Sequence, residues 1–281
     1  SQVGCWAIWR ILSDRTMMTA DMVMQAFPAF LLVLCRISAF CVVAPVISSR
    51  NVPAFLKVGL AFFISVLVFL SVGFDASVTT DGTYILAILR EILAGLLIGY
   101  VAVLFFAVMQ TAGTLMDLKI GFGIANIVDP VTGVSVSLLG NLKYMLTMLV
   151  FLSMNGHHYL LAAIMHSYQW LPLDNELFSR IAQGPLAEFL VRTFADTFRM
   201  ALQIAAPIAV SMALTDIGMG LLARSAPQFN IFVVGIPVKI FIGLAMLVVL
   251  LPGMGYLFQV LFDQMFQAMD RMFVLLSGSQ P

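Results

Sequence analysis

The stretch RSAPQFNIFVVGIPVKI, residues 224–240, interrupts a long apolar region and decides how that region can fold. Proline has no backbone N–H and disfavours helical conformation in the residue before it. Pro227 therefore predicts that one helix ends near Arg224–Ser225 and that a second begins near Phe229 after a tight connection. Arg224 would lie in a last helical turn, where the helix dipole favours a cation. We expect Pro237 to kink the second helix.

The same stretch places polar and charged residues within a region that is otherwise apolar enough to lie in the bilayer. A charge at the bilayer centre costs between about 2.5 and 17 kcal/mol, and non-helical backbone in lipid leaves hydrogen-bonding groups unpaired. Such a segment is tolerated where it packs on protein or lines water, or where it is a plain turn outside the membrane between two spans. We predict a structural turn or subunit interface for two groups of residues. They are Arg224, Pro227, Gln228, Asn230 and Pro237 here, with Arg36 and Pro45 near the amino end.

The composition is that of a polytopic membrane protein. Of the 281 residues, 62% are hydrophobic and only 10% are charged, with a mean hydropathy of +1.04. Soluble domains are about 45–50% apolar and about 25% charged. The net charge is zero, which gives no support to a nucleic-acid-binding function, because that function requires a basic surplus.

About 20 apolar residues span a hydrocarbon core, and this length predicts an all-α protein of kinked and broken helical hairpins. Residues 19–277 are predicted as one all-helical domain, and residues 1–18 as an extension that precedes it. The segment 171–199 is predicted to be polar and extramembrane, with a helical second half from Pro185. A helix shorter than a span is predicted over His157–Trp170, and a terminal helix over Met254–Leu276. The predicted spans are Phe27–Ser48, Ala54–Val72, Tyr84–Leu115, Val134–Met154, Met200–Ala223 and Phe229–Leu251.

A second interruption, MDLKIGFGIANIVDPVTGVS at residues 116–135, combines loop chemistry with apolar side chains. Gly121 and Gly123 permit unusual backbone angles, and Asp129–Pro130 is typical of a turn. Apolar residues such as Phe122 have no role in a solvated loop. The segment is therefore either a loop packed on other helices or a constriction that closes a pathway and yields.

No residue pattern indicates chemistry. The sequence has no nucleophile–base set, phosphate-binding loop, dinucleotide fingerprint or zinc-protease motif, so we predict neither enzyme activity nor a cofactor. The three histidines lack the close ligand pairs that zinc sites use, so no metal site is predicted. Glu91 follows Arg90 and is interpreted as half of an interfacial pair, with a proton relay as the alternative. Gly95-x-x-x-Gly99 is a spacing that allows close helix packing.

Four stretches, in this order and spacing, resemble the FliR family of flagellar type III export-gate proteins. They are CRISAFCVVAPVISSRNVP (35–53), MDLKIGFGIANIVDP (116–130), FLSMNGHHYLL (151–161) and LLARSAPQFNIFVVGIPVKI (221–240). The resemblance covers nearly the whole chain from about residue 20.

The resemblance implies a core subunit of the export gate in the bacterial inner membrane and the flagellar basal body. Its partners would be FliP, FliQ and FlhB-like proteins, arranged in a helical assembly through which unfolded flagellar proteins pass. The segment Lys119–Gly133 matches the loop that closes the pore in this family. The gating residues implied are Lys119, Ile120, Gly121, Phe122, Gly123, Ile124, Asp129 and Pro130.

Two other functions stay open at this level. A virulence-type export gate would have the same architecture and different cargo. A secondary transporter for a small solute would place broken helices around a midplane site, although no inverted repeat is evident.

Overall fold

The computed structural model describes residues 26–49, 52–72, 82, 84–122, 137–172, 177–178, 184–226, 228 and 230–277. Within these ranges every regular element is a helix, and no strand occurs. Five of the described helices are long and apolar enough to cross a membrane. The helices are Ala26–Val43, α2 (Ala54–Val72), α3 (Tyr84–Ile120), α5 (Leu138–Ser153), α6 (Gly156–Trp170), α8 (Pro185–Ser225) and α9 (Ile231–Ser277).

Several predicted boundaries are confirmed. The helix α2 has the predicted range, and α8 ends at Ser225, directly before the Ala226–Pro227 pair. The next helix begins at Ile231, two residues later than predicted. The helices α5 and α6 are separated by a 74° bend at Met154–Asn155, where Asn155 has a positive φ of 57°.

The two longest helices were wrongly divided by the sequence prediction. The polar segment from Pro185 and the span beginning at Met200 form one helix of 41 residues. The last span and the terminal helix form one helix of 47 residues that continues through Pro252. Exposed pairs three and four residues apart, Asp196–Arg199 and Glu188–Arg192, support helical structure in the polar part of α8. A rule that looks for about 20 apolar residues per span divides such a helix, because it recognises only the apolar part as one element.

The described residues belong to two compact units. The first lies within Ser1–Tyr100, Leu161–Gln183 and Leu276–Pro281. The second comprises Val101–Leu160 and Gly184–Leu275. The prediction of a single all-helical domain over 19–277 remains a prediction.

A fully buried arginine organises the first unit. Arg36, in the first helix, donates from Nε to Glu91 Oε2 at 2.6 Å and from an Nη to Glu91 Oε1 at 3.0 Å. The remaining guanidinium donors reach Ser167 Oγ at 3.1 Å and the Leu171 carbonyl at 2.9 Å. The guanidinium also lies 4.1 Å from the centre of the Tyr168 ring. One side chain thereby joins the first helix to α3 and to the end of α6.

Gly95 and Gly99, whose spacing allows close helix packing, lie where α3 meets the first helix. A Cβ atom at Gly95 would collide with the Arg36 carbonyl oxygen, and one at Gly99 would lie 2.9 Å from Val43 Cβ. Two glycines one turn apart therefore let α3 contact the backbone of the first helix. This contact brings Glu91, one turn before Gly95, within reach of Arg36.

We expect Arg36→Met to destabilise the protein by about 3–5 kcal/mol, because the buried Glu91 carboxylate loses both hydrogen bonds from Arg36. Thermal unfolding in detergent measures the effect. The matched control is Arg192→Met, which removes an exposed ion pair and should change stability by no more than about 0.5 kcal/mol. Equal midpoints for the two variants would contradict the role assigned to Arg36.

Candidate functional site

The predicted gating segment begins at the carboxyl end of α3. Lys119 is exposed in the last turn, and Ile120, the last helical residue, is completely buried. Gly121 has a φ of +104°, a conformation that L side chains rarely adopt. Phe122 follows and is partly buried. Gly123, Ile124, Asp129 and Pro130 lie outside the described residues.

Asp117, near the end of α3, binds the amino end of α5. Its carboxylate accepts the backbone N–H of Leu139 at 3.0 Å and the hydroxyl of Ser137 at 2.6 Å. Ser137 is the N-cap of α5, and its Oγ accepts the N–H of Gly140 at 2.9 Å. The first N–H groups of a helix have no partner within the helix, and they favour a nearby anion. The carboxyl end of α3 is thus fixed against the amino end of α5.

Two glycines allow the helices to approach closely at this point. A Cβ atom at Gly113 of α3 would lie 2.6 Å from the Gly140 nitrogen and the Leu139 carbonyl oxygen of α5. No side chain separates the two backbones there. The last turns of α3 and the first turn of α5 are therefore in direct backbone contact.

The start of the segment is anchored in the core of the second unit. Ile120 packs directly on Gly243 of α9, where a Cβ atom would meet its side chain at 2.7 Å. Phe122 packs against the same core cluster. The buried members of that cluster are Met116, Ile120, Leu139, Ala205, Ile208 and Met212.

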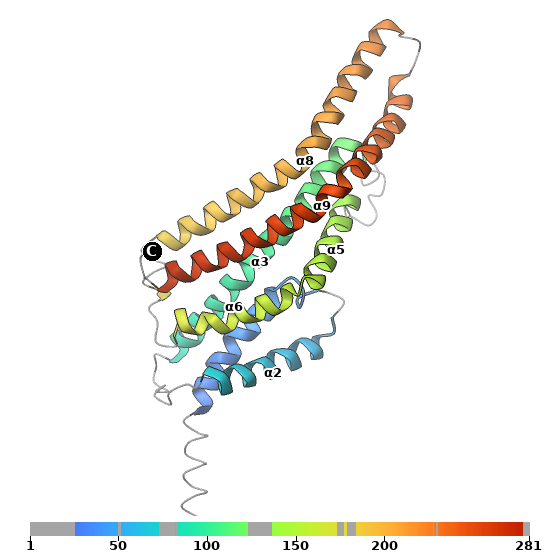
Figure 1. Ribbon diagram of the computed structural model, residues 1–281. Helices are drawn as coiled ribbons and strands as arrows, with labels where there is room; N and C mark the ends of the chain where they lie inside the picture. The colour runs from blue at the N-terminus through green and yellow to red at the C-terminus, as the bar shows by residue number, and fades with distance from the viewer. Residues whose placement is uncertain are drawn as a thin grey trace, which may run out of the picture. The chain divides into compact units, whose positions relative to one another are not determined.

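The helices α8 and α9 lie side by side and run in opposite directions, so that they form a helical hairpin (Figure 1). Arg224 lies in the last turn of α8, Gln228 in the connection, and Asn230 accepts the N–H of Val233 at the start of α9. Pro237 lies inside α9. Pro227 lies outside the described residues.

An ion pair joins the two arms of this hairpin. Lys239 of α9 contacts the carboxylate of Asp216 of α8. The pair accounts for a lysine that a simple turn between two spans does not explain. In the first unit, Pro45 lies in the turn that follows the helix Ala26–Val43.

The structure shows two roles that sequence reasoning missed. Glu91 was assigned to its neighbour Arg90, whose Nε lies 4.0 Å away, but its closest partner is Arg36 at 2.6 Å. Asp117 was not selected at all. The sequence does contain a feature that could have identified it. Asp117 is a carboxylate near the end of an apolar helix, and a charge in such a place requires a partner. No group of three or more metal-ligating side chains occurs among the described residues.

We expect Asp117→Ala to loosen the amino end of α5, because the buried N–H of Leu139 loses its acceptor at a cost of about 1–3 kcal/mol. Hydrogen–deuterium exchange of the peptide covering Leu139 and Gly140 should become at least about tenfold faster. Ser153→Ala, at the exposed opposite end of α5, is the matched control. Unchanged exchange in Asp117→Ala would show that the carboxylate does not hold the two helix ends.

Known proteins are similar to this chain over most of its length. Residues 27–265 match the family model described as bacterial export proteins, family 1. The flagellar biosynthetic protein FliR of Bacillus subtilis is 40% identical over 227 residues, which cover 81% of this chain and 87% of that protein. FliR of Escherichia coli is 31% identical, covering 83% and 88% of the two chains. The Yop proteins translocation protein T of Yersinia pestis is 30% identical, covering 83% and 89%. The chain belongs to family 1 of the bacterial export proteins.

Proposed function

We propose that this chain is a FliR-type core subunit of the flagellar type III export gate in the bacterial inner membrane. The observation that carries the proposal is the 40% identity to a flagellar FliR over 87% of that protein. The subunit would line and close a channel for unfolded flagellar proteins, beside FliP, FliQ and FlhB-like subunits. It would act by conformational change, without catalysis.

The length of the exposed apolar surface supports membership of a multi-subunit assembly. Exposed large apolar side chains of α8 extend from Val191 to Leu222, a path of about 47 Å at 1.5 Å per residue. A hydrocarbon core is about 30 Å thick. The stretch is therefore longer than one hydrocarbon core, and its first part carries the exposed charges Arg192, Asp196 and Arg199, so lipid alone does not account for it.

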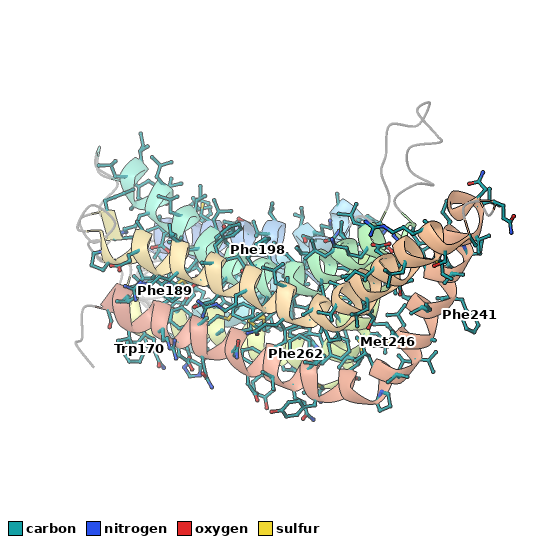
Figure 2. The ribbon with its side chains drawn as sticks, turned by 90° about the horizontal axis from the view of Figure 1, so that it is seen from above. Trp170, Phe189, Phe198, Phe241, Met246 and Phe262 are labelled. Carbon is teal, nitrogen blue, oxygen red and sulfur yellow. The ribbon has the colours of Figure 1, made fainter. Side chains whose placement is uncertain are left out.

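Charged and aromatic groups within the same surface point to the same conclusion. The exposed pairs Glu188–Arg192 and Asp196–Arg199 lie beside Phe194 and Phe198, and Figure 2 shows Phe198 on α8. On α9, Phe241 is 76% exposed and points away from the helices (Figure 2). Mixed polar and apolar surfaces are typical of protein interfaces, whereas lipid favours purely apolar ones.

A virulence export gate is the second candidate, because the Yersinia translocation protein T is 30% identical over a similar share of the chain. Both functions use the same type of assembly. The greater identity to the Bacillus protein favours the flagellar one.

Expression in a Bacillus subtilis strain that lacks its own FliR tests the flagellar function. We expect swimming to be restored, and native mass measurement of the gently extracted protein should show one copy among several copies of two smaller partners. A monomer or homodimer in the presence of those partners would overturn the proposal. Rescue of a Yersinia strain lacking its translocation protein T, without rescue of swimming, would assign the chain to virulence export.

We also propose that Lys119–Gly133 closes the pore. Gly121→Val forces a β-branched residue into a φ of +104° and should displace the start of the segment, although open space surrounds this position. We expect reduced export, increased ion leakage, or both, measured by secreted flagellin and by membrane-potential dyes. Gly59→Val in α2, also in open space, is the control. Wild-type export and leakage in Gly121→Val would contradict the gating role.

A further inference from the structure

The second unit contains a buried cation that has no anionic partner among the described residues. Lys143, on α5, is only 4% exposed. Among the described residues, the one hydrogen-bond acceptor of its ammonium group is the Met254 sulfur at 3.6 Å. A thioether is a weak acceptor, and an ammonium group buried without a matching charge is strongly unfavourable.

A cavity of about 410 Å³ adjoins this ammonium group. Thirteen of its fifteen lining residues belong to α8 and α9, and the other two are Lys143 and Met116. Both of these are buried, whereas Gly253 and Tyr256 of α9 are exposed. The cavity is therefore a slot between the two arms of the hairpin, with Lys143 at its floor and Gly253 at its rim.

The described carboxylates of the second unit do not reach this floor. Asp117 binds the start of α5, and Asp216 pairs with Lys239. Glu188 and Asp196 pair with arginines on α8. The remaining two, Asp263 and Asp270, are exposed on α9.

The rest of the lining suits a side chain that combines an apolar stem with a polar end. Met200, Ile204 and Leu257 provide apolar walls, and Gln203 and Gln264 provide amide groups. A Cβ atom at Gly253 would meet no atom within 4 Å, so a neighbouring helix can come close to the rim.

We propose that this slot receives an aspartate or glutamate side chain from a helix of a neighbouring subunit, whose carboxylate pairs with Lys143. This rests on the proposed function, since it requires partner subunits. The pair would be formed on assembly and would be shielded from water by α8 and α9. Lys143 would then favour correctly placed partners, because a subunit without the carboxylate would leave the ammonium group unpaired.

The test compares the isolated chain with the assembled particle. In Lys143→Met, a buried charge is replaced by an apolar side chain of similar length. The midpoint of thermal unfolding of the isolated chain in detergent should therefore stay equal or rise. The yield of the assembled particle should fall at least about tenfold, because the partner carboxylate is left buried and unpaired. Lys57→Met is the control, because Lys57 already donates to the Ser48 carbonyl in its own chain, and it should assemble at wild-type yield.

A second variant blocks the slot without changing charge. Gly253→Leu adds a side chain where the isolated chain has open space, so the unfolding midpoint should be kept while particle yield falls. A wild-type yield of particles containing Lys143→Met would overturn the proposal. That yield is the result expected if a lipid headgroup, and not a partner carboxylate, occupied the slot. A lower unfolding midpoint of the isolated Lys143→Met chain would also overturn it, because Lys143 would then be paired within its own chain, for example with Asp129. Absence of any particle for the unmodified chain would contradict the proposed function instead.

Discussion

Buried charge is the constraint on which the rest of this structure depends. An apolar chain cannot solvate an ion, so each buried charge must find its partner within the fold or in the assembly. In the first unit, Arg36 is matched by Glu91, and its other donors reach Ser167 and Leu171. In the second, Asp117 is matched by the amino end of α5. These contacts determine which helices meet, whereas apolar packing alone would allow many arrangements.

The helices themselves were largely predictable, because hydropathy depends only on local sequence. The bounds of α2 and the end of α8 follow from an apolar run and from a proline that disfavours helix before it. The length of α8 and α9 did not follow from the same reasoning. A rule built on one bilayer crossing divides any helix that extends beyond it. The prolines at 207 and 252 lie inside helices that continue past them, as neighbouring helices permit.

The partners of the charged residues could not be predicted from the local sequence, because they lie far away along the chain. Arg36 and Glu91 are 55 residues apart, and Asp117 and Leu139 are 22 apart. The predicted pair of Glu91 with its neighbour Arg90 is present at 4.0 Å, but the closer partner Arg36 comes from another helix and could not be found from local sequence. What could be predicted was that each charge needed a partner. The glycines at 95 and 99 were a better guide, since they mark where a second backbone comes close enough for a partner to be reached.

The same constraint separates two lysines that the sequence does not distinguish. Lys239 and Lys143 both lie in apolar helices of the second unit. Lys239 faces Asp216 across the hairpin and so fixes one arm of the chain against the other. Lys143 lies at the floor of a slot between those arms, and no described carboxylate reaches it. A subunit that must fold and then assemble needs both kinds of charge. A charge that is paired within the chain helps to define the fold. A charge that is paired only on assembly makes the folded subunit more stable in the assembly than alone.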